Sequence, residues 1–100
     1  VVNQKGEALY FSRALIPYPR EDFAMPPLKH IGVYAYRRSF LLTYAETEQT
    51  PLEKTESLEQ LRALETGHKI GVIRIETEDI GIDTEADLKK ANEFFKRSNL

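Results

Sequence analysis

An arginine that follows an apolar stretch is the first residue of this 100-residue sequence with a clear chemical use. Leu9–Phe11 predicts a buried strand, and Ser12 and Arg13 come directly after it. The planar guanidinium group of arginine binds a carboxylate or a phosphate through paired hydrogen bonds, which lysine cannot do. Arg13 is therefore a candidate ligand for an acidic small molecule. The alternative is a structural salt bridge to one of the 16 acidic residues.

A histidine and a tyrosine form the second candidate group. Residues 30–36 (HIGVYAY) alternate as in a strand, so His30 and Tyr34 would lie on the same face as Tyr36. Two polar side chains on one face could act as donors in a ligand pocket. The alternative is a partly buried histidine that packs against aromatic rings and binds nothing.

The remaining candidates are two carboxylates and an amide. Glu59 and Gln60 follow Leu58 in the middle of a predicted helix. Adjacent helical positions are about 100° apart, so one of the pair flanks the buried stripe with its polar end available to a ligand, unless this is simply a solvated face. Asp83 lies between a predicted strand and a predicted helix. There it could cap the helix, or hold a metal ion or phosphate at the edge of an α/β sheet.

The composition excludes several classes of function. A formal net charge of −2 and a pI of about 5.7 argue against a nucleic-acid or membrane-surface partner. The absence of cysteine removes disulfides and thiolate chemistry and fits a cytoplasmic protein, and two histidines cannot form a His-rich zinc site. The sequence has no Gly-rich phosphate loop, no G-x-S-x-G motif and no HExxH motif. We therefore expect a ligand-binding part of a domain without a complete catalytic apparatus.

The first third of the chain predicts three strands and a loop. The start, VVNQKGEALYF, is typical of a hairpin with a turn at Asn3–Gly6 and a short first arm, which suggests a fragment. Residues 15–29 contain four of the five prolines and predict a structured loop. The strand at residues 30–36 follows this loop.

Three helices and a further strand complete the prediction. Ser39 would cap a short helix over residues 40–47. One helix is expected over residues 50–67, with four leucines in one stripe. Its signals are a capping box, a proline at the first position and a glycine stop: Thr50 with Glu53, Pro51 and Gly67.

The C-terminal part predicts a strand at residues 68–76 and a helix at residues 83–98. Thr84 and Asp87 would cap this last helix, and Leu88, Ala91 and Phe95 would face inward. The predicted order is β-β-β-α-α-β-α, which indicates an α/β fold in one unit over residues 1–100.

Four blocks of the sequence resemble a known family. In order they are ALYFSRALIP, KHIGVYAYR, PLEKTESLEQLRAL and GIDTEADL, and together they cover nearly the whole chain. They closely resemble the C-terminal portion of the 3-deoxy-manno-octulosonate cytidylyltransferases, also called CMP-Kdo synthetases. The pairing of YFSR…IP with LEQLR distinguishes this family from sialic-acid cytidylyltransferases and from sugar-phosphate nucleotidyltransferases of the same fold.

The resemblance implies a fold, an activity and partners. The fold would be the C-terminal part of a Rossmann-like mixed sheet of the nucleotide-diphospho-sugar transferase type. The family transfers CMP from CTP to the acid sugar Kdo, releases pyrophosphate and serves lipopolysaccharide assembly. Mg²⁺ neutralises the phosphates in this reaction, and the enzymes are usually homodimers. The chain would be the sugar-binding and dimerisation half of such an enzyme.

The resemblance also assigns roles to the candidate residues. Arg13 matches the residue near the Kdo carboxylate, His30 and Tyr34 match donors of the sugar pocket, Glu59 and Gln60 match partners of the sugar hydroxyls, and Asp83 matches a Mg²⁺ ligand. The family's N-terminal CTP loop and a second metal-binding aspartate have no counterpart here, so this chain by itself should not turn over. Two alternatives stay open: a structural or dimerisation module, and a cytidylyltransferase for a related acid sugar such as a sialic acid.

Overall fold

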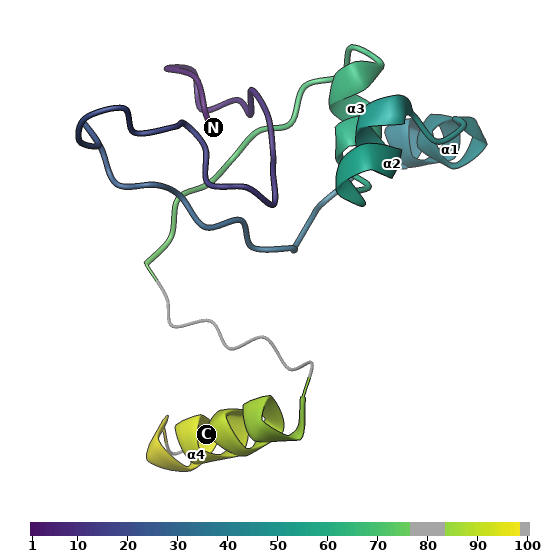
Figure 1. Cartoon of the computed structure of the whole chain (residues 1–100). Helices are drawn as coiled ribbons and strands as arrows, with labels where there is room; N and C mark the ends of the chain where they lie inside the picture. Colours follow the sequence, from purple (N-terminus) through teal and green to yellow (C-terminus); the bar gives the residue numbers. More distant parts are fainter. Residues whose placement is uncertain (77–83, 99–100) are drawn as a thin grey trace.

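The computed structural model describes residues 1–76 and 84–98. Within these residues the chain forms four helices: α1 (Arg38–Glu46), α2 (Pro51–Glu56), α3 (Leu61–Glu65) and α4 (Glu85–Ser98). Helices α1, α2 and α3 gather at one end of the structure, and the N-terminal segment runs beside the segment that follows α3 (Figure 1). Asp83 and the residues around it lie outside the described part of the chain.

The predicted N-terminal hairpin is present, although it pairs at a single point. Val2 forms an antiparallel bridge with Ala8. The turn between them is fixed by Asn3, whose Oδ1 accepts hydrogen bonds from the backbone N–H groups of Lys5 and Glu7, both at 2.9 Å. Gly6 adopts a φ of 77°, which glycine reaches without strain. The predicted turn at Asn3–Gly6 is confirmed.

The segment at residues 70–72 pairs with the hairpin, although it is more than 60 positions away in the sequence. Glu7 forms an antiparallel bridge with Gly71, and Ala8 N–H donates to the carbonyl of Ile70 at 2.8 Å. Val72 N–H donates to the carbonyl of Gly6, also at 2.8 Å. These contacts place part of the predicted strand at residues 68–76 beside the hairpin.

The predicted strand at residues 30–36 has no ladder partner among the described residues. Val33 N–H donates to the carbonyl of Ile31 at 2.9 Å, which is a tight turn and not a ladder bond. Val33 is 83% exposed, so the apolar side of this segment is not covered by the described part of the chain. The physical reason is that a strand depends on pairing with another segment, which alternation of side chains alone does not supply.

Helix α1 begins earlier than the sequence suggested. Its first residue is Arg38 and its N-cap is Arg37, which makes no side-chain capping bond, so the prediction of Ser39 as the cap is wrong. Tyr44 is the buried residue of this helix and is 7% exposed.

The single helix predicted over residues 50–67 is in fact two helices. Pro51 starts α2 and Gly67 follows α3 with a φ of 90°, as predicted, but Ser57 interrupts the helix with φ 52° and ψ 44°. Glu59 and Gln60 therefore lie in a turn between α2 and α3 and not in mid-helix. No local pattern predicts this interruption, because Ser57 is not the glycine that usually takes the left-handed conformation.

Helix α4 starts with the predicted caps. Thr84 N–H donates to Asp87 Oδ2 and Asp87 N–H donates to Thr84 Oγ1, both at 3.2 Å. Of the three residues predicted to face inward, Ala91 is buried, whereas Leu88 and Phe95 are 47% and 53% exposed. Within the described residues, the prediction that Leu88 and Phe95 face inward is therefore wrong.

Candidate functional site

A large open cavity lies between the segment at residues 27–37, helices α1 and α3, and the segment at residues 68–75. Its volume is about 1290 Å³. Three of the predicted site residues, His30, Tyr34 and Gln60, are among its lining residues. The fold thus brings together candidates from two segments that are far apart in the sequence.

His30 and Tyr34 contact each other directly. Tyr34 Oη and His30 Nε2 form a hydrogen bond, and their ring centroids are 5.7 Å apart. The edge of the His30 ring also packs on Phe11, with the centroids 5.0 Å apart. These neighbours partly desolvate His30, which lowers its pKa, and burial raises the pKa of Tyr34 to about 12. Both groups are therefore neutral near pH 7 and can exchange hydrogen bonds with a polar ligand.

A row of aromatic rings continues from this pair along the cavity. Tyr34 stacks on Tyr36 at 6.1 Å, Tyr36 on Phe40 at 5.9 Å, and Phe40 on Tyr44 at 5.5 Å. The edge of Phe40 also contacts His68 at 4.8 Å. The rings form a rigid wall of the cavity. Each ring turns about few bonds and is held in place by its stacked neighbours.

Gln60 lines the cavity and has an unpaired side-chain donor. The residue is 7% exposed, and its side-chain Nε2 has no hydrogen-bond partner in the described structure. An amide N–H₂ group that is buried without a partner is unfavourable unless a ligand supplies an acceptor. This atom is the strongest local indication of a binding site. Glu59, its neighbour, is exposed and does not line the cavity.

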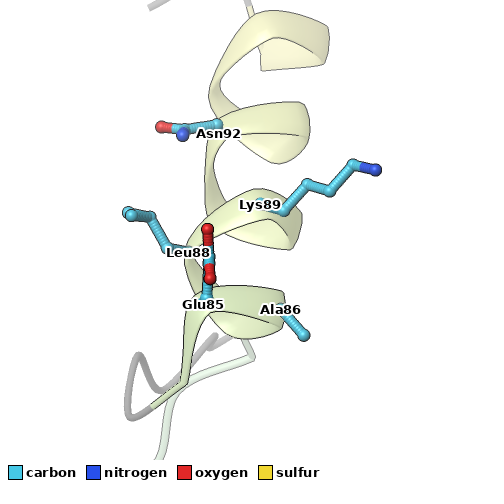
Figure 2. Close-up of a pocket in the computed structure, with 5 residues that line it drawn as sticks. All are labelled: Glu85, Ala86, Leu88, Lys89 and Asn92. Carbon is cyan, nitrogen blue, oxygen red and sulfur yellow. The ribbon is translucent and has the colours of Figure 1, made fainter.

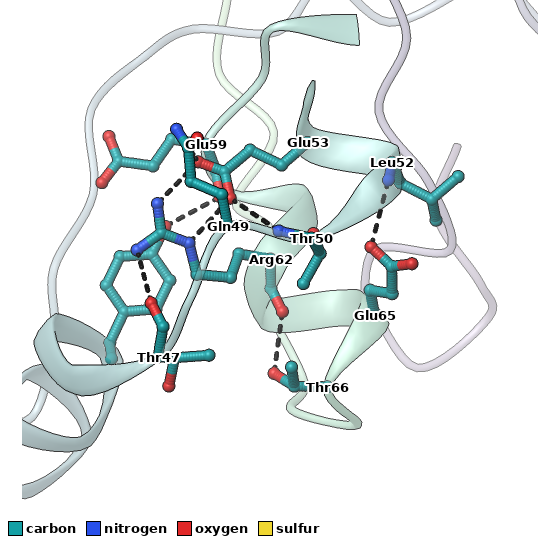
Figure 3. A network of polar contacts seen from close by, with 10 residues as sticks. Thr47, Gln49, Thr50, Leu52, Glu53, Glu59, Arg62, Glu65 and Thr66 are labelled. Atoms are coloured by element: carbon teal, nitrogen blue, oxygen red, sulfur yellow. Dashed lines mark hydrogen bonds and ion pairs between the residues drawn. The ribbon is translucent and has the colours of Figure 1, made fainter. Parts of the chain in front are cut away.

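The turn that carries Glu59 and Gln60 is held by a network of polar contacts (Figure 3). Arg62 Nε donates to Glu53 Oε2 at 2.7 Å, and Arg62 Nη2 donates to Glu53 Oε1 at 2.6 Å. The guanidinium carbon lies 4.7 Å from the centre of the Tyr44 ring. Tyr44 Oη in turn donates to the carbonyl of Glu59 at 2.7 Å. Two helices and the turn between them are thereby tied together.

Arg13 contacts the end of α2 and the first residue of the same turn. Its Nε donates to the carbonyl of Glu56 at 2.6 Å, and its Nη2 donates to the carbonyl of Ser57 at 2.9 Å. The carboxylate of Glu56 accepts bonds from the backbone N–H of Arg13 and from the Ser12 hydroxyl. Those bonds hold the pKa of Glu56 below its ordinary value. Arg13 therefore caps the end of α2, and a guanidinium carries five N–H donors, so some remain for a ligand.

The charged side chains that line the cavity within the described residues are all positive. Four lysine and arginine residues line it, and no aspartate or glutamate is among its lining residues in the described part of the chain: Lys29, Arg37, Lys69 and Arg74. One of them, Lys69, pairs with Glu7 at 3.6 Å. A concave surface of this kind attracts anions, although the chain as a whole has a net charge of −2.

Metal binding has no support within the described residues. They contain no group of three histidine, aspartate or glutamate side chains that could hold a metal ion, and Asp83 lies outside them.

A smaller depression on α4 offers no site either. Figure 2 shows Ala86 and Lys89 extending from one side of this helix and Leu88 and Asn92 from the other, so the side chains do not converge. None of the helices in the described ranges is long and apolar enough to cross a bilayer.

Sequence reasoning missed two residues that shape the site, Tyr44 and Arg62. The spacing of Tyr36, Phe40 and Tyr44, four residues apart, could have indicated an aromatic face. For Arg62 no local signal exists, because its partner Glu53 becomes a neighbour only through the interruption of the helix at Ser57.

Comparisons with known proteins agree with the predicted resemblance. Residues 1–70 match the family model described as cytidylyltransferase. A 3-deoxy-manno-octulosonate cytidylyltransferase of Solibacter usitatus is 48% identical over 101 residues, and one of Fusobacterium nucleatum is 44% identical over 100 residues. The matches cover 100% of this chain but 40% and 41% of those relatives. The chain therefore spans about two fifths of the length of the curated relatives it matches.

A solved structure agrees as well. CMP:2-keto-3-deoxy-manno-octonic acid synthetase complexed with CTP superimposes with a TM-score of 0.92 at 42% identity, over 98% of this chain and 41% of that chain. The shared fold is that of a nucleotidyltransferase, which supports the predicted fold class, while the strand order β-β-β-α-α-β-α stays a prediction. On its match to the family model and its agreement with these relatives, the chain belongs to the cytidylyltransferase family.

Proposed function

We propose that this chain is the sugar-binding part of a cytidylyltransferase that transfers CMP from CTP to 3-deoxy-manno-octulosonate (Kdo) and releases pyrophosphate. The observation that carries this proposal is the cavity, which combines a positive lining with the unpaired buried amide of Gln60. Kdo carries a carboxylate and several hydroxyl groups, so it matches both features. The names of the relatives support the same substrate.

The proposed roles follow from the chemistry of each side chain. Arg13 would bind the carboxylate of the sugar, His30 and Tyr34 would exchange hydrogen bonds with its oxygens, and Glu59 and Gln60 would bind its hydroxyl groups. In the transfer step, the anomeric hydroxyl oxygen forms a bond to the α-phosphorus and releases its proton to water. The bond from the α-phosphorus to the oxygen that bridges it to the β-phosphorus breaks, and pyrophosphate leaves with the electron pair. The residues of this chain act by holding the sugar in place, which lowers the entropic part of the barrier.

Most of the CTP site belongs to sequence that this chain does not contain. The metal proposal rests on Asp83, which would help to hold Mg²⁺, and the ion would neutralise charge on the phosphates. A reaction that uses CTP would take place in the cytoplasm. If the proposal is correct, Asp83→Asn should raise the Mg²⁺ concentration needed for half-maximal activity and leave Kdo binding to the isolated chain unchanged.

The experiment has two parts. First, calorimetry measures the binding of Kdo to the 100-residue chain, with a neutral sugar of the same size as control. Second, the chain replaces the matching segment of the Solibacter usitatus relative, and pyrophosphate release is measured with CTP, Mg²⁺ and Kdo. Activity with Kdo and not with a sialic acid is the expected result. Activity with a sialic acid alone would establish the alternative substrate, and a folded but inactive hybrid that binds no Kdo would refute the proposal.

We also propose that the partner of this chain is a second copy. Large apolar side chains in the loop at residues 15–28 are exposed: Leu15 at 59%, Tyr18 at 84% and Met25 at 54%. Exposed apolar side chains gathered in one loop favour a protein interface. Analytical ultracentrifugation of the hybrid should give a dimer, and Tyr18→Asp should give a monomer. A dimer that tolerates this substitution would place the interface elsewhere.

A structural module without ligand remains the competing function. It is favoured by one observation, that Arg13 is already bonded to the end of α2. The two functions differ in their prediction for Arg13→Ala. A structural module loses stability only, whereas a sugar site loses Kdo affinity beyond what the change in stability explains.

A further inference from the structure

The helix interruption at Ser57 needs a physical cause. Its left-handed backbone conformation is unfavourable for any residue except glycine, and nothing in the sequence from Pro51 to Glu65 prevents a continuous helix. Specific side-chain contacts in the folded chain must therefore stabilise the interrupted form.

The pair formed by Glu53 and Arg62 is such a contact. In a continuous helix, residues nine positions apart are separated by about 13.5 Å along the axis and about 180° around it. The two side chains would then point in opposite directions. In the structure they form two charge-assisted hydrogen bonds, at 2.6 and 2.7 Å, with side chains that are only 6% and 13% exposed. The pair is therefore compatible only with an interrupted helix.

Further contacts of Arg62 reinforce this arrangement. Its Nη1 donates to the carbonyl of Thr47 at 3.3 Å, which connects α3 to the end of α1. Its guanidinium also lies over the Tyr44 ring, whose hydroxyl group bonds to the carbonyl of Glu59. Arg62 thus contacts each element that borders the turn at residues 57–60.

We propose that Arg62 is a positioning residue for the sugar site. By pairing with Glu53 and packing on Tyr44, it keeps the helix interrupted at Ser57. The interrupted form directs Gln60 into the cavity and leaves Glu59 beside it. The statement about the sugar rests on the function proposed above, whereas the statement about the turn does not.

The test compares Arg62→Gln with Lys54→Gln in the 100-residue chain. Both substitutions remove one positive charge, and Lys54 is an exposed residue of α2 that does not line the cavity. Backbone NMR shifts of residues 57–60 report the turn. We expect these residues to acquire helical shifts in Arg62→Gln and to keep their wild-type shifts in Lys54→Gln. Arg62→Lys, which keeps the charge but not the paired bonds, should restore the turn in part.

Kdo affinity is measured on the same variants by following the side-chain amide signals of Gln60. Affinity in Arg62→Gln should fall about tenfold, as expected for the loss of roughly one hydrogen bond, with partial recovery in Arg62→Lys. If the wild-type chain binds no Kdo while the turn responds as described, the proposed function is wrong, but the role of Arg62 in holding the turn stands. A folded Arg62→Gln with an unchanged turn overturns the proposal. Unfolding of both Arg62 variants also overturns it, because the residue would then support the whole fold and not this turn.

Discussion

Removal of the charge on Glu53 offers the sharpest test of how the site is held together. Glu53→Gln keeps the shape of the side chain but leaves the guanidinium of Arg62 without its negative partner. Glu53 is 5% exposed, and its carboxylate also accepts a hydrogen bond from the backbone N–H of Thr50 at 3.4 Å. The variant therefore loses one bond to Arg62 and weakens the other.

The magnitude follows from these contacts. A hydrogen bond to a charged group contributes about 1.5–3 kcal/mol, and the variant loses one such bond, so we expect a loss of about 2 kcal/mol. For a chain of this size, such a loss lowers the Tm by about 8–16 °C. Thermal unfolding followed by circular dichroism measures this change. Glu48→Gln, the same substitution at an exposed residue, is the matched control.

The dependence on pH provides a second check. The hydrogen bonds from Arg62 lower the pKa of Glu53 from its ordinary value of 4.5, so the folded chain keeps the carboxylate ionised where the unfolded chain has already taken up a proton. The contribution of the pair is complete above that value and is lost as the pH falls through the lowered pKa. The difference in stability between wild type and Glu53→Gln should therefore be largest near neutral pH and disappear in acid. A difference that is absent at neutral pH, or that is equally large at about pH 3, would refute this reasoning.

Three further predictions concern single side chains. Gln60→Leu should raise the Tm, because it removes a buried donor that has no partner. It should also abolish Kdo binding in calorimetry. A lower Tm would show that the amide of Gln60 has a hydrogen-bond partner. Arg13→Ala should lower the Tm, and Arg13→Lys should restore only part of it, because one ammonium group cannot reach the carbonyls of both Glu56 and Ser57 with the geometry of a guanidinium. His30 should titrate below its ordinary pKa of 6.5 in an NMR titration, because partial burial disfavours its charged form, and a midpoint at or above 6.5 would contradict the arrangement of its neighbours.

Local signals in the sequence predicted local features well. The turn at Asn3–Gly6 and the caps formed by Thr84 and Asp87 were identified correctly. Each of these features depends on contacts between residues that are at most four positions apart, so the sequence contains everything that decides them. The grouping of His30 with Tyr34 was correct for the same reason.

The candidate site was predictable only in part. His30, Tyr34 and Gln60 line one cavity, whereas Glu59 does not line it, Arg13 caps a helix, and Asp83 falls outside the described residues. The resemblance to a family identified these residues before any geometry was known. It did not show which of them share a surface in this chain.

The sequence by itself determined the family, the turn at Asn3–Gly6, the caps of α4 and the residues with suitable chemistry. Only the tertiary structure decided where the helix over residues 51–65 is interrupted and which side chains meet at the cavity. The reason is the range of the deciding contacts. Arg13 reaches residues 43 and 44 positions away, and Arg62 pairs with a residue that a continuous helix would place on its opposite side. Such contacts compete with local helix propensity, so the whole fold decides whether a helix continues or is interrupted.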